Sequence, residues 1–165
     1  VGIDIIFFDA EDYGVPKFVT DYKGDSNETW CLGSRYWAKN PHVKDYRARY
    51  GILLDMVGAP NAKFDQEYHS LQYAKDVVER VWSTGRKLGY GDYFIAKKQS
   101  GVYDDHIPVN EFRRAPSIDI IQYDETTDHG FGSYWHTQKD DMSNIDRETL
   151  KVVGQTVLEV IYKEK

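Results

Sequence analysis

The chain has only one cysteine, Cys31, and this scarcity excludes several kinds of site. A single thiol cannot close an internal disulfide, and it lacks the second cysteine of a CxxC redox or zinc motif. The simplest interpretation of Cys31 is a small, buried, apolar residue near the start of a helix. The cysteine count therefore leaves the redox compartment open.

Clustered positive charge and long apolar runs are also lacking. Lys and Arg number 21 against 27 Asp and Glu, which gives a net charge of −6. Binding to nucleic acid needs clustered basic residues that displace counterions from phosphates, and the sequence shows no basic stripe. Apolar runs such as Ile5 to Phe8 are far shorter than a membrane span. We therefore expect neither a nucleic-acid partner nor a membrane-spanning segment.

What is present is the composition of one folded, soluble domain. The 165 residues are 41% hydrophobic and 29% charged, close to ordinary globular proteins. This length allows one compact core and is short for two. Internal repeats and low-complexity tracts are not visible.

The first eight residues, Val1 to Phe8, have the pattern of a buried strand. A continuous run of β-branched and aromatic residues is typical of strands covered on both faces, as in parallel or mixed sheets. A protein rarely begins inside its sheet, so this pattern predicts further strands upstream of Val1. We therefore expect residues 1–165 to be the C-terminal portion of a domain.

The rest of the sequence alternates between strand and helix signals. The polar, Gly-rich stretch 9–28 predicts a long surface loop, and loops of this length are often functional. Helical periodicity recurs around 69–88, and Asp146 is a good N-cap for a last helix with Leu150, Val153, Val157 and Ile161 as its apolar stripe. Strands are expected at 1–8, 50–57 and 117–122, and helices at 30–39, 69–88 and after Asp146.

This order predicts an α/β fold with a mixed, mostly parallel central sheet flanked by helices. In such sheets, ligands bind at the carboxyl ends of the strands. Several acids and a few histidines lie near the ends of the predicted elements. They are residue types typical of a metal site, because zinc binds imidazole nitrogen and carboxylate oxygen. The residues are Glu11, Asp12, Asp55, Asp104, Asp105, His106 and His136.

Each signal also has an ordinary structural interpretation. Acids after a strand often cap a loop, and His136 can be a hydrogen-bonded surface histidine. Asp55 is harder to dismiss, because a buried carboxylate without a partner costs several kcal/mol or more. The spacing of these residues alone indicates a metallohydrolase and nothing more specific.

Five short blocks stand in order along the sequence and together span nearly the whole chain. They are Ile6-Phe7-Phe8-Asp9-Ala10-Glu11-Asp12, Leu32-Gly33-Ser34-Arg35, Leu53-Leu54-Asp55-Met56-Val57-Gly58-Ala59-Pro60-Asn61, Asp104-Asp105-His106-Ile107-Pro108 and Trp135-His136-Thr137. This set of blocks resembles the glutaminyl cyclases, a branch of the zinc aminopeptidase-like M28 group. The acid pair reads E-D, as in bacterial cyclases of the animal type.

The resemblance implies a zinc-exopeptidase fold and a function. Glutaminyl-peptide cyclotransferases convert the N-terminal glutamine of peptides or proteins to pyroglutamate with release of ammonia. Carried over, Asp12 and His136 are ligands of a single Zn²⁺, and Glu11 is the proton shuttle. Asp55 and Asp104 belong to a hydrogen-bonded network near Glu11, whereas Trp135 and, more loosely, Trp30 line the substrate pocket.

One expected ligand has no counterpart in the sequence. The family holds its zinc with a further aspartate in an H-x-D segment on an earlier strand, so we expect the third protein ligand upstream of Val1. The resemblance also implies export to a bacterial periplasm or secretion, and a monomer is expected.

Two other functions stay open at this point. In an M28-type zinc aminopeptidase, Asp55 would bind a second metal and Glu11 would activate water to hydrolyse off N-terminal residues. One zinc per chain favours cyclisation, whereas two favour hydrolysis. A non-catalytic domain that grips peptide N-termini is the third possibility, and the intact set of acids argues against it.

Overall fold

The structure is a computed structural model that describes residues 2–15 and 19–164. Helices and strands alternate as the sequence predicts, which confirms the α/β class. The elements are η1 Ser26–Thr29, α1 Leu32–Lys39, β1 Gly51–Asp55, β2 Phe64–Gln66, α2 Tyr68–Lys87, β3 Phe94–Lys98, α3 His106–Pro108, η2 Val109–Arg113, β4 Ser117–Ile121, η3 Met142–Asn144 and α4 Arg147–Tyr162. Among the described residues, no helix combines the length and apolarity needed to cross a bilayer.

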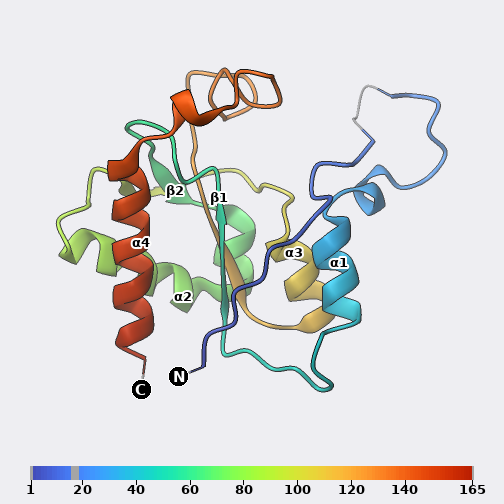
Figure 1. Cartoon of the computed structure of the whole chain (residues 1–165), viewed down its shortest axis with the longest axis horizontal. Helices are drawn as coiled ribbons and strands as arrows, with labels where there is room; N and C mark the ends of the chain where they lie inside the picture. Colours follow the sequence, from blue (N-terminus) through green and yellow to red (C-terminus); the bar gives the residue numbers. More distant parts are fainter. Residues whose placement is uncertain (1, 16–18, 165) are drawn as a thin grey trace.

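The described strands pair in parallel. β1 pairs with β4 in the register Gly51 to Ser117 through Asp55 to Ile121, and β2 pairs with β3. Figure 1 shows α2 and α4 to one side of the β1–β4 pair and α1 and α3 to the other. This arrangement places the ends of β1 and β4 between helices that carry polar residues.

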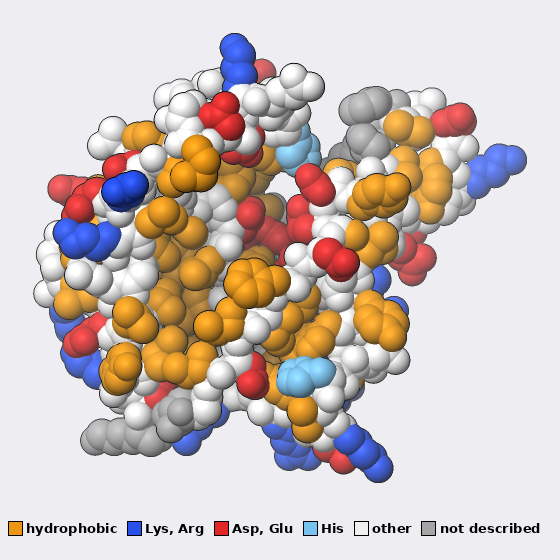
Figure 2. All heavy atoms as spheres, viewed as in Figure 1, with side chains coloured by type: hydrophobic (Ala, Val, Ile, Leu, Met, Phe, Trp, Pro, Cys, Tyr) orange, Lys and Arg blue, Asp and Glu red, His pale blue; other side chains and the backbone are white. Residues whose placement is uncertain are grey.

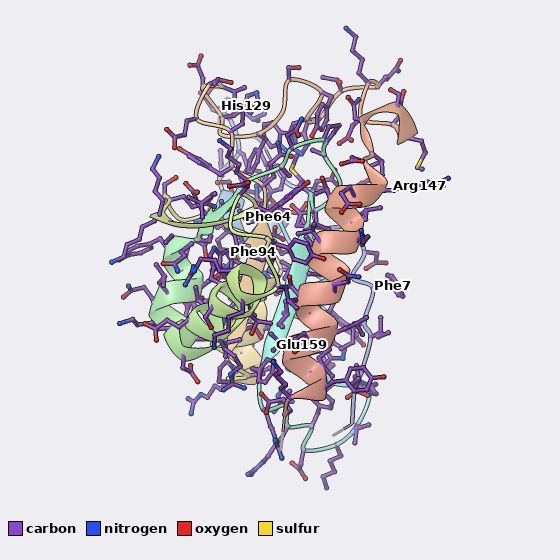
Figure 3. All side chains as sticks on the ribbon, turned by 90° about the vertical axis from the view of Figure 1, so that its left-hand side faces the viewer. Phe7, Phe64, Phe94, His129, Arg147 and Glu159 are labelled. Carbon is purple, nitrogen blue, oxygen red and sulfur yellow. The ribbon has the colours of Figure 1, made fainter. Side chains whose placement is uncertain are left out.

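The main core lies between α2, α4 and the strands. Trp82 is fully buried, donates from its indole nitrogen to the Phe64 carbonyl and packs edge-on against Phe94. Figure 3 shows Phe64 and Phe94 next to each other in the interior, where their ring centroids are 5.6 Å apart. The predicted periodicity of α2 is confirmed, since Val77, Val78, Val81 and Trp82 are all buried there.

The sequence prediction was wrong about the first segment. Residues 2–10 form no strand, and Ile5 and Phe7 are 78% and 93% exposed. Figure 3 places Phe7 at the outer edge, away from the phenylalanine pair of the core. A strand needs a neighbouring strand and cover on both faces. Within the described residues this segment has no neighbouring strand, and its side chains are covered only in part, as where Phe8 packs on Trp37.

The last helix also differs from its predicted apolar stripe. Asp146 caps α4 as expected and accepts hydrogen bonds from the backbone of Glu148 and Thr149. The fully buried face, however, consists of Thr149, Val152, Val153, Thr156 and Val160. Leu150 is 43% exposed, because the helix is rotated so that Thr149 and Thr156 face the core instead. Their hydroxyls donate to the carbonyls of Ala59 and Val152.

Two strands were missed from the sequence. β2 and β3 are only three and five residues long, which is too short for a clear alternating pattern. The helix α2 separates them in the sequence. Conversely, β1 is only half buried and shorter than the predicted 50–57, whereas β4 is buried at every position.

Candidate active site

The acidic segment 9–12 is held by the start of α1. The first backbone N–H groups of a helix have no partner within the helix, and here carbonyls of the acidic segment accept them. Cys31 N donates to Glu11 O at 2.8 Å, Leu32 N to Ala10 O at 3.1 Å and Gly33 N to Asp9 O at 3.1 Å. The Glu11 backbone is therefore fixed by the helix even though its segment has no regular structure.

The close approach of Gly33 to the Asp9 backbone explains why position 33 is a glycine. A Cβ at Gly33 would lie 2.4 Å from the Asp9 carbonyl oxygen, which is too close for any side chain. Ala10 and Cys31, on either side of the contact, both have φ in the left-handed region, at 50° and 54°. Backbone strain of this kind tends to occur where a site needs a particular geometry.

The Glu11 carboxylate lies among other acids. Burial raises the pKa of Glu11 from 4.5 to about 7, and the negative charges of Asp105, Asp55 and Asp12 add to the rise. The thiol of Cys31 donates to Glu11 Oε1 at 3.8 Å. Burial raises the pKa of the Cys31 thiol far above its ordinary value, so this thiol stays protonated and acts as a donor.

Asp55 and Asp104 form the inner part of this group. Asp55 ends β1, and Met56 after it has a left-handed φ of 50°. Asp104 immediately precedes the turn into α3 and accepts from the Asp105 backbone N–H. Burial raises the pKa of both carboxyls. The negative charge of Asp55 raises the pKa of Asp104 further, whereas a hydrogen bond with Asp104 lowers the pKa of Asp55. Below, "acid cluster" means Glu11, Asp55, Asp104, Asp105 and Asp119.

Asp119 is a member that the sequence analysis missed. It lies in the middle of β4 and is completely buried, and neither of its carboxylate oxygens has a hydrogen-bond partner. Burial and the charges of Asp104 and Asp55 raise its pKa well above the ordinary value. The sequence did contain a signal for Asp119. It lies within the apolar run Ser117 to Gln122, and a carboxylate buried without a partner is costly, which is the argument used for Asp55.

The second part of the site is an open cleft of about 540 Å³. Its lining includes Asp12, Trp30 and His136, three residues predicted for the site, together with Asp140. Figure 2 shows acidic side chains gathered around a hollow between the body of the domain and the arm formed by residues 11–15 and 19–30, with a histidine at its rim. The structure thus brings the predicted ligands Asp12 and His136 to one cleft, and both are exposed there.

Trp135 does not line this cleft but stacks on His136. Their ring centroids are 3.9 Å apart with an interplanar angle of 19°. Phe131 and His129 pack against Trp135, each with ring centroids 5.0 Å away. Figure 3 shows His129 on the loop that follows β4. The four rings form an aromatic group that orients the His136 imidazole, whose own φ of 55° is left-handed.

The donors in the cleft suit zinc. A carboxylate and an imidazole on an exposed surface match its preference for oxygen and nitrogen ligands, and an open cleft leaves room for further ligands. Separately, Glu11, Cys31 and Asp104 offer donor atoms within 4.8 Å of one another. These three differ from the predicted ligands, and the raised pKa values of Glu11 and Asp104 indicate groups that hold protons.

A smaller hollow connects the two parts of the site. Its volume is about 220 Å³, and it is lined by Asp55, Tyr134 and Asp140 among others. Asp140 therefore borders both the cleft of Asp12 and the end of β1. The sequence analysis did not single out Asp140, which follows the Trp135-His136-Thr137 block by three residues.

Comparison with known proteins gives a consistent family. The Peptidase family M28 pattern matches residues 1–161. A crystal structure of a Zn-dependent exopeptidase from Parabacteroides distasonis is 62% identical to the chain, with a TM-score of 0.90 over 96% of this chain and 53% of that one. Tannerella forsythia glutaminyl cyclase is 60% identical, with a TM-score of 0.89 over 96% and 54%.

A more distant relative is also named for glutaminyl cyclisation. The glutaminyl-peptide cyclotransferase of Bos taurus is 28% identical over an alignment 185 positions long, which covers 98% of this chain and 47% of the relative. The chain thus spans about half the length of the relatives it matches. It belongs to peptidase family M28 and is similar in sequence and fold to bacterial glutaminyl cyclases.

Proposed function

We propose that this chain carries the proton-transfer half of a glutaminyl-peptide cyclotransferase site. The observation that supports it most is the pairing of a buried acid cluster, in which the pKa of Glu11 is about 7, with an exposed cleft that holds Asp12 and His136. Substrates are peptides or proteins with an N-terminal glutamine, as expected for the activity named for the relatives.

The reaction needs one proton to move. The α-amine nitrogen of glutamine attacks its own γ-amide carbonyl carbon, the carbon–nitrogen bond of the amide breaks, and ammonia leaves. Glu11 accepts the proton from the attacking amine and delivers it to the leaving nitrogen. A carboxyl whose pKa is about 7 can do both near neutral pH, because neither its protonated nor its ionised form is strongly favoured.

The neighbours of Glu11 set its orientation and its charge environment. Asp55 places negative charge beside Glu11, Asp104, whose pKa is raised to about 9, shares a hydrogen bond with Asp55, and the Cys31 thiol donates to Glu11 Oε1. Like charges and burial both favour the protonated form of a carboxyl. Asp55 and Asp104 therefore act on the chemistry through Glu11.

Asp12 and His136 would hold the zinc, together with a third protein ligand predicted upstream of Val1. Zinc bound there supplies Lewis acidity toward the γ-amide carbonyl oxygen. One zinc per chain is expected. Trp135 keeps the His136 ring in place by stacking, and Trp30, packed on Gly14 at the cleft wall, would exclude water from the ring that forms.

The product decides between cyclisation and hydrolysis. We expect the full-length protein to convert a glutaminyl peptide to a pyroglutamyl peptide and ammonia, with the peptide chain intact by mass spectrometry. Free glutamine and a shortened peptide would instead support an aminopeptidase. An inert protein that binds the peptide would support the non-catalytic alternative. Export and a monomeric state stay predictions.

A further inference from the structure

Two buried polar residues, Glu67 and His106, adjoin Asp119 of the acid cluster, and no role has yet been given to them. Glu67, His106 and Asp119 are almost completely inaccessible to solvent. Glu67 Oε2 is 3.2 Å from His106 Nε2, and His106 Nδ1 is 4.0 Å from Asp119 Oδ2. The imidazole thus lies between two carboxylates that come from α2 and from β4.

Glu67 makes more contacts than a helix cap requires. As the N-cap of α2 it accepts from the backbone N–H groups of His69 and Ser70, at 2.8 and 2.6 Å. It also accepts from the backbone N–H of Val102 at 3.0 Å and pairs with His106. The last two contacts reach the segment on either side of Asp104, so Glu67 fixes that segment to the start of α2.

The environment of Glu67 indicates a stable charge. Burial raises the pKa of Glu67, but the hydrogen bond and charge of His106 and the N–H groups of Ser70 and His69 outweigh burial, and the pKa falls to about 2. Among the described residues, lysine and arginine form their ion pairs with carboxylates outside the acid cluster. Near the acid cluster, the basic side chain within ion-pair distance of carboxylates is therefore His106.

The turn that carries Asp104 depends on the same residues. Ile107 N donates to the Asp104 carbonyl at 2.8 Å, and the Asn110 amide donates to the His106 carbonyl at 2.8 Å. Ser70 Oγ donates to Glu67 and accepts from the Asp119 backbone N–H at 2.9 Å. Movement of the His106 ring would therefore displace the Asp104 turn relative to β4.

We propose that Glu67 is a positioning residue for proton transfer: through its buried ion pair with His106, it holds Asp104 in place beside Asp55 and Glu11. The proposal rests on the proposed cyclotransferase function. It assigns to the Glu67–His106 pair an effect on the chemical step that a simple helix cap would not have.

Kinetics of Glu67→Gln in the full-length protein test this role. Glutamine keeps the size and an acceptor oxygen for the cap but removes the charge that faces His106. We expect kcat for ammonia release to fall about 10- to 100-fold, as for other buried partners that orient a functional group, while KM changes little. Asp146→Asn is the matched control, because Asp146 caps α4 in the same way without contacting the acid cluster; its kcat should stay unchanged.

A second variant separates the ion pair from the cap. His106→Gln leaves the Glu67 cap intact but removes the ion pair, and we expect the same loss of kcat. In the double variant the loss should not exceed that of either single variant, because one interaction is removed in each case. This variant also carries the test if Glu67→Gln does not fold.

Nuclear magnetic resonance reports the ion pair directly. The Nε2–H proton of a buried imidazole that donates to a carboxylate should give a downfield, slowly exchanging signal, lost in both Glu67→Gln and His106→Gln. Absence of this signal in the wild-type protein, or a wild-type kcat in Glu67→Gln, overturns this inference alone. If the wild-type protein releases no ammonia, the cyclotransferase proposal falls together with it.

Discussion

The two parts of the candidate site are built in opposite ways. Apart from Glu11, the acid cluster lies at the end of β1, within β4 and around the Asp104 turn; most of its carboxylates are buried and all have raised pKa values. The cleft with Asp12 and His136 lies on irregular segments, and both side chains are exposed.

The difference corresponds to two kinds of chemistry. Proton transfer near neutral pH needs a carboxyl whose charge is disfavoured, and burial among other acids provides this. A catalytic metal needs accessible ligands and an open position for substrate. On the proposed function, one region handles protons and the other binds the metal, so variants of the two should fail in different ways.

The largest expected effect is at Glu11. Glu11→Gln keeps the shape of the side chain but cannot accept a proton, so turnover should fall by at least about 10²- to 10⁴-fold. Zinc content, measured by metal analysis, should stay the same, because Glu11 is not among the predicted ligands. Glu28→Gln, at an exposed acid on the same arm, is the control and should keep its activity. Equal turnover in both variants would remove Glu11 from the mechanism.

His136→Ala should instead lose activity because it binds zinc more weakly. Loss of an imidazole ligand weakens zinc binding, so activity at limiting zinc should disappear and should recover in part when zinc is added. His42→Ala is the control, since His42 is an exposed histidine that packs on Trp37 and does not line the cleft. If His42→Ala released zinc and His136→Ala retained it, the ligand assignment would be wrong.

Asp55→Asn should have an intermediate effect. The amide removes the negative charge of Asp55, which raises the pKa of Glu11, so the pKa of Glu11 should fall and kcat should drop about 10- to 100-fold. The acid limb of the pH profile for kcat/KM should move to lower pH, which rate measurements across the pH range would detect. Asp65→Asn, at a buried acid of β2, should leave the profile in place.

The smallest effect concerns stability and pH in the metal-free protein. The pKa of Glu67 is lowered to about 2, so its contribution is complete above 4.5 and is lost as pH falls from there toward 2. The pKa of Glu11 is raised to about 7, so folding stability declines as pH rises from 4.5 through 7. Thermal unfolding should therefore show greatest stability near pH 4 to 5, about where both limbs meet. Glu67→Gln should flatten the acid limb alone; an unchanged acid limb would contradict the ion pair.

Sequence patterns predicted the elements whose signals are local. Three such signals each lie within one element: the cap at Asp146, the periodicity over Leu71 to Trp82 and the apolar run Ser117 to Gln122. The structure confirms the corresponding elements α4, α2 and β4. The segment Val1 to Phe8 was misjudged because burial depends on neighbours that the pattern itself does not contain.

The site followed the same rule. Glu11, Asp55 and Asp104 were found because they stand at element ends and match a family motif. Glu67 was missed because its function depends on Val102 and His106, which are far away in sequence and become neighbours only through the fold. Cys31 appeared to be a simple buried residue, although its thiol contacts Glu11.

The account is tested most directly by ammonia release from a glutaminyl dipeptide, measured with the full-length protein before and after treatment with a chelator. We predict ammonia release that stops in the chelator, returns with one equivalent of zinc per chain and leaves no free glutamine. Undiminished release in the metal-free protein, or the appearance of free glutamine, would contradict the division of labour between the buried acids and the exposed cleft.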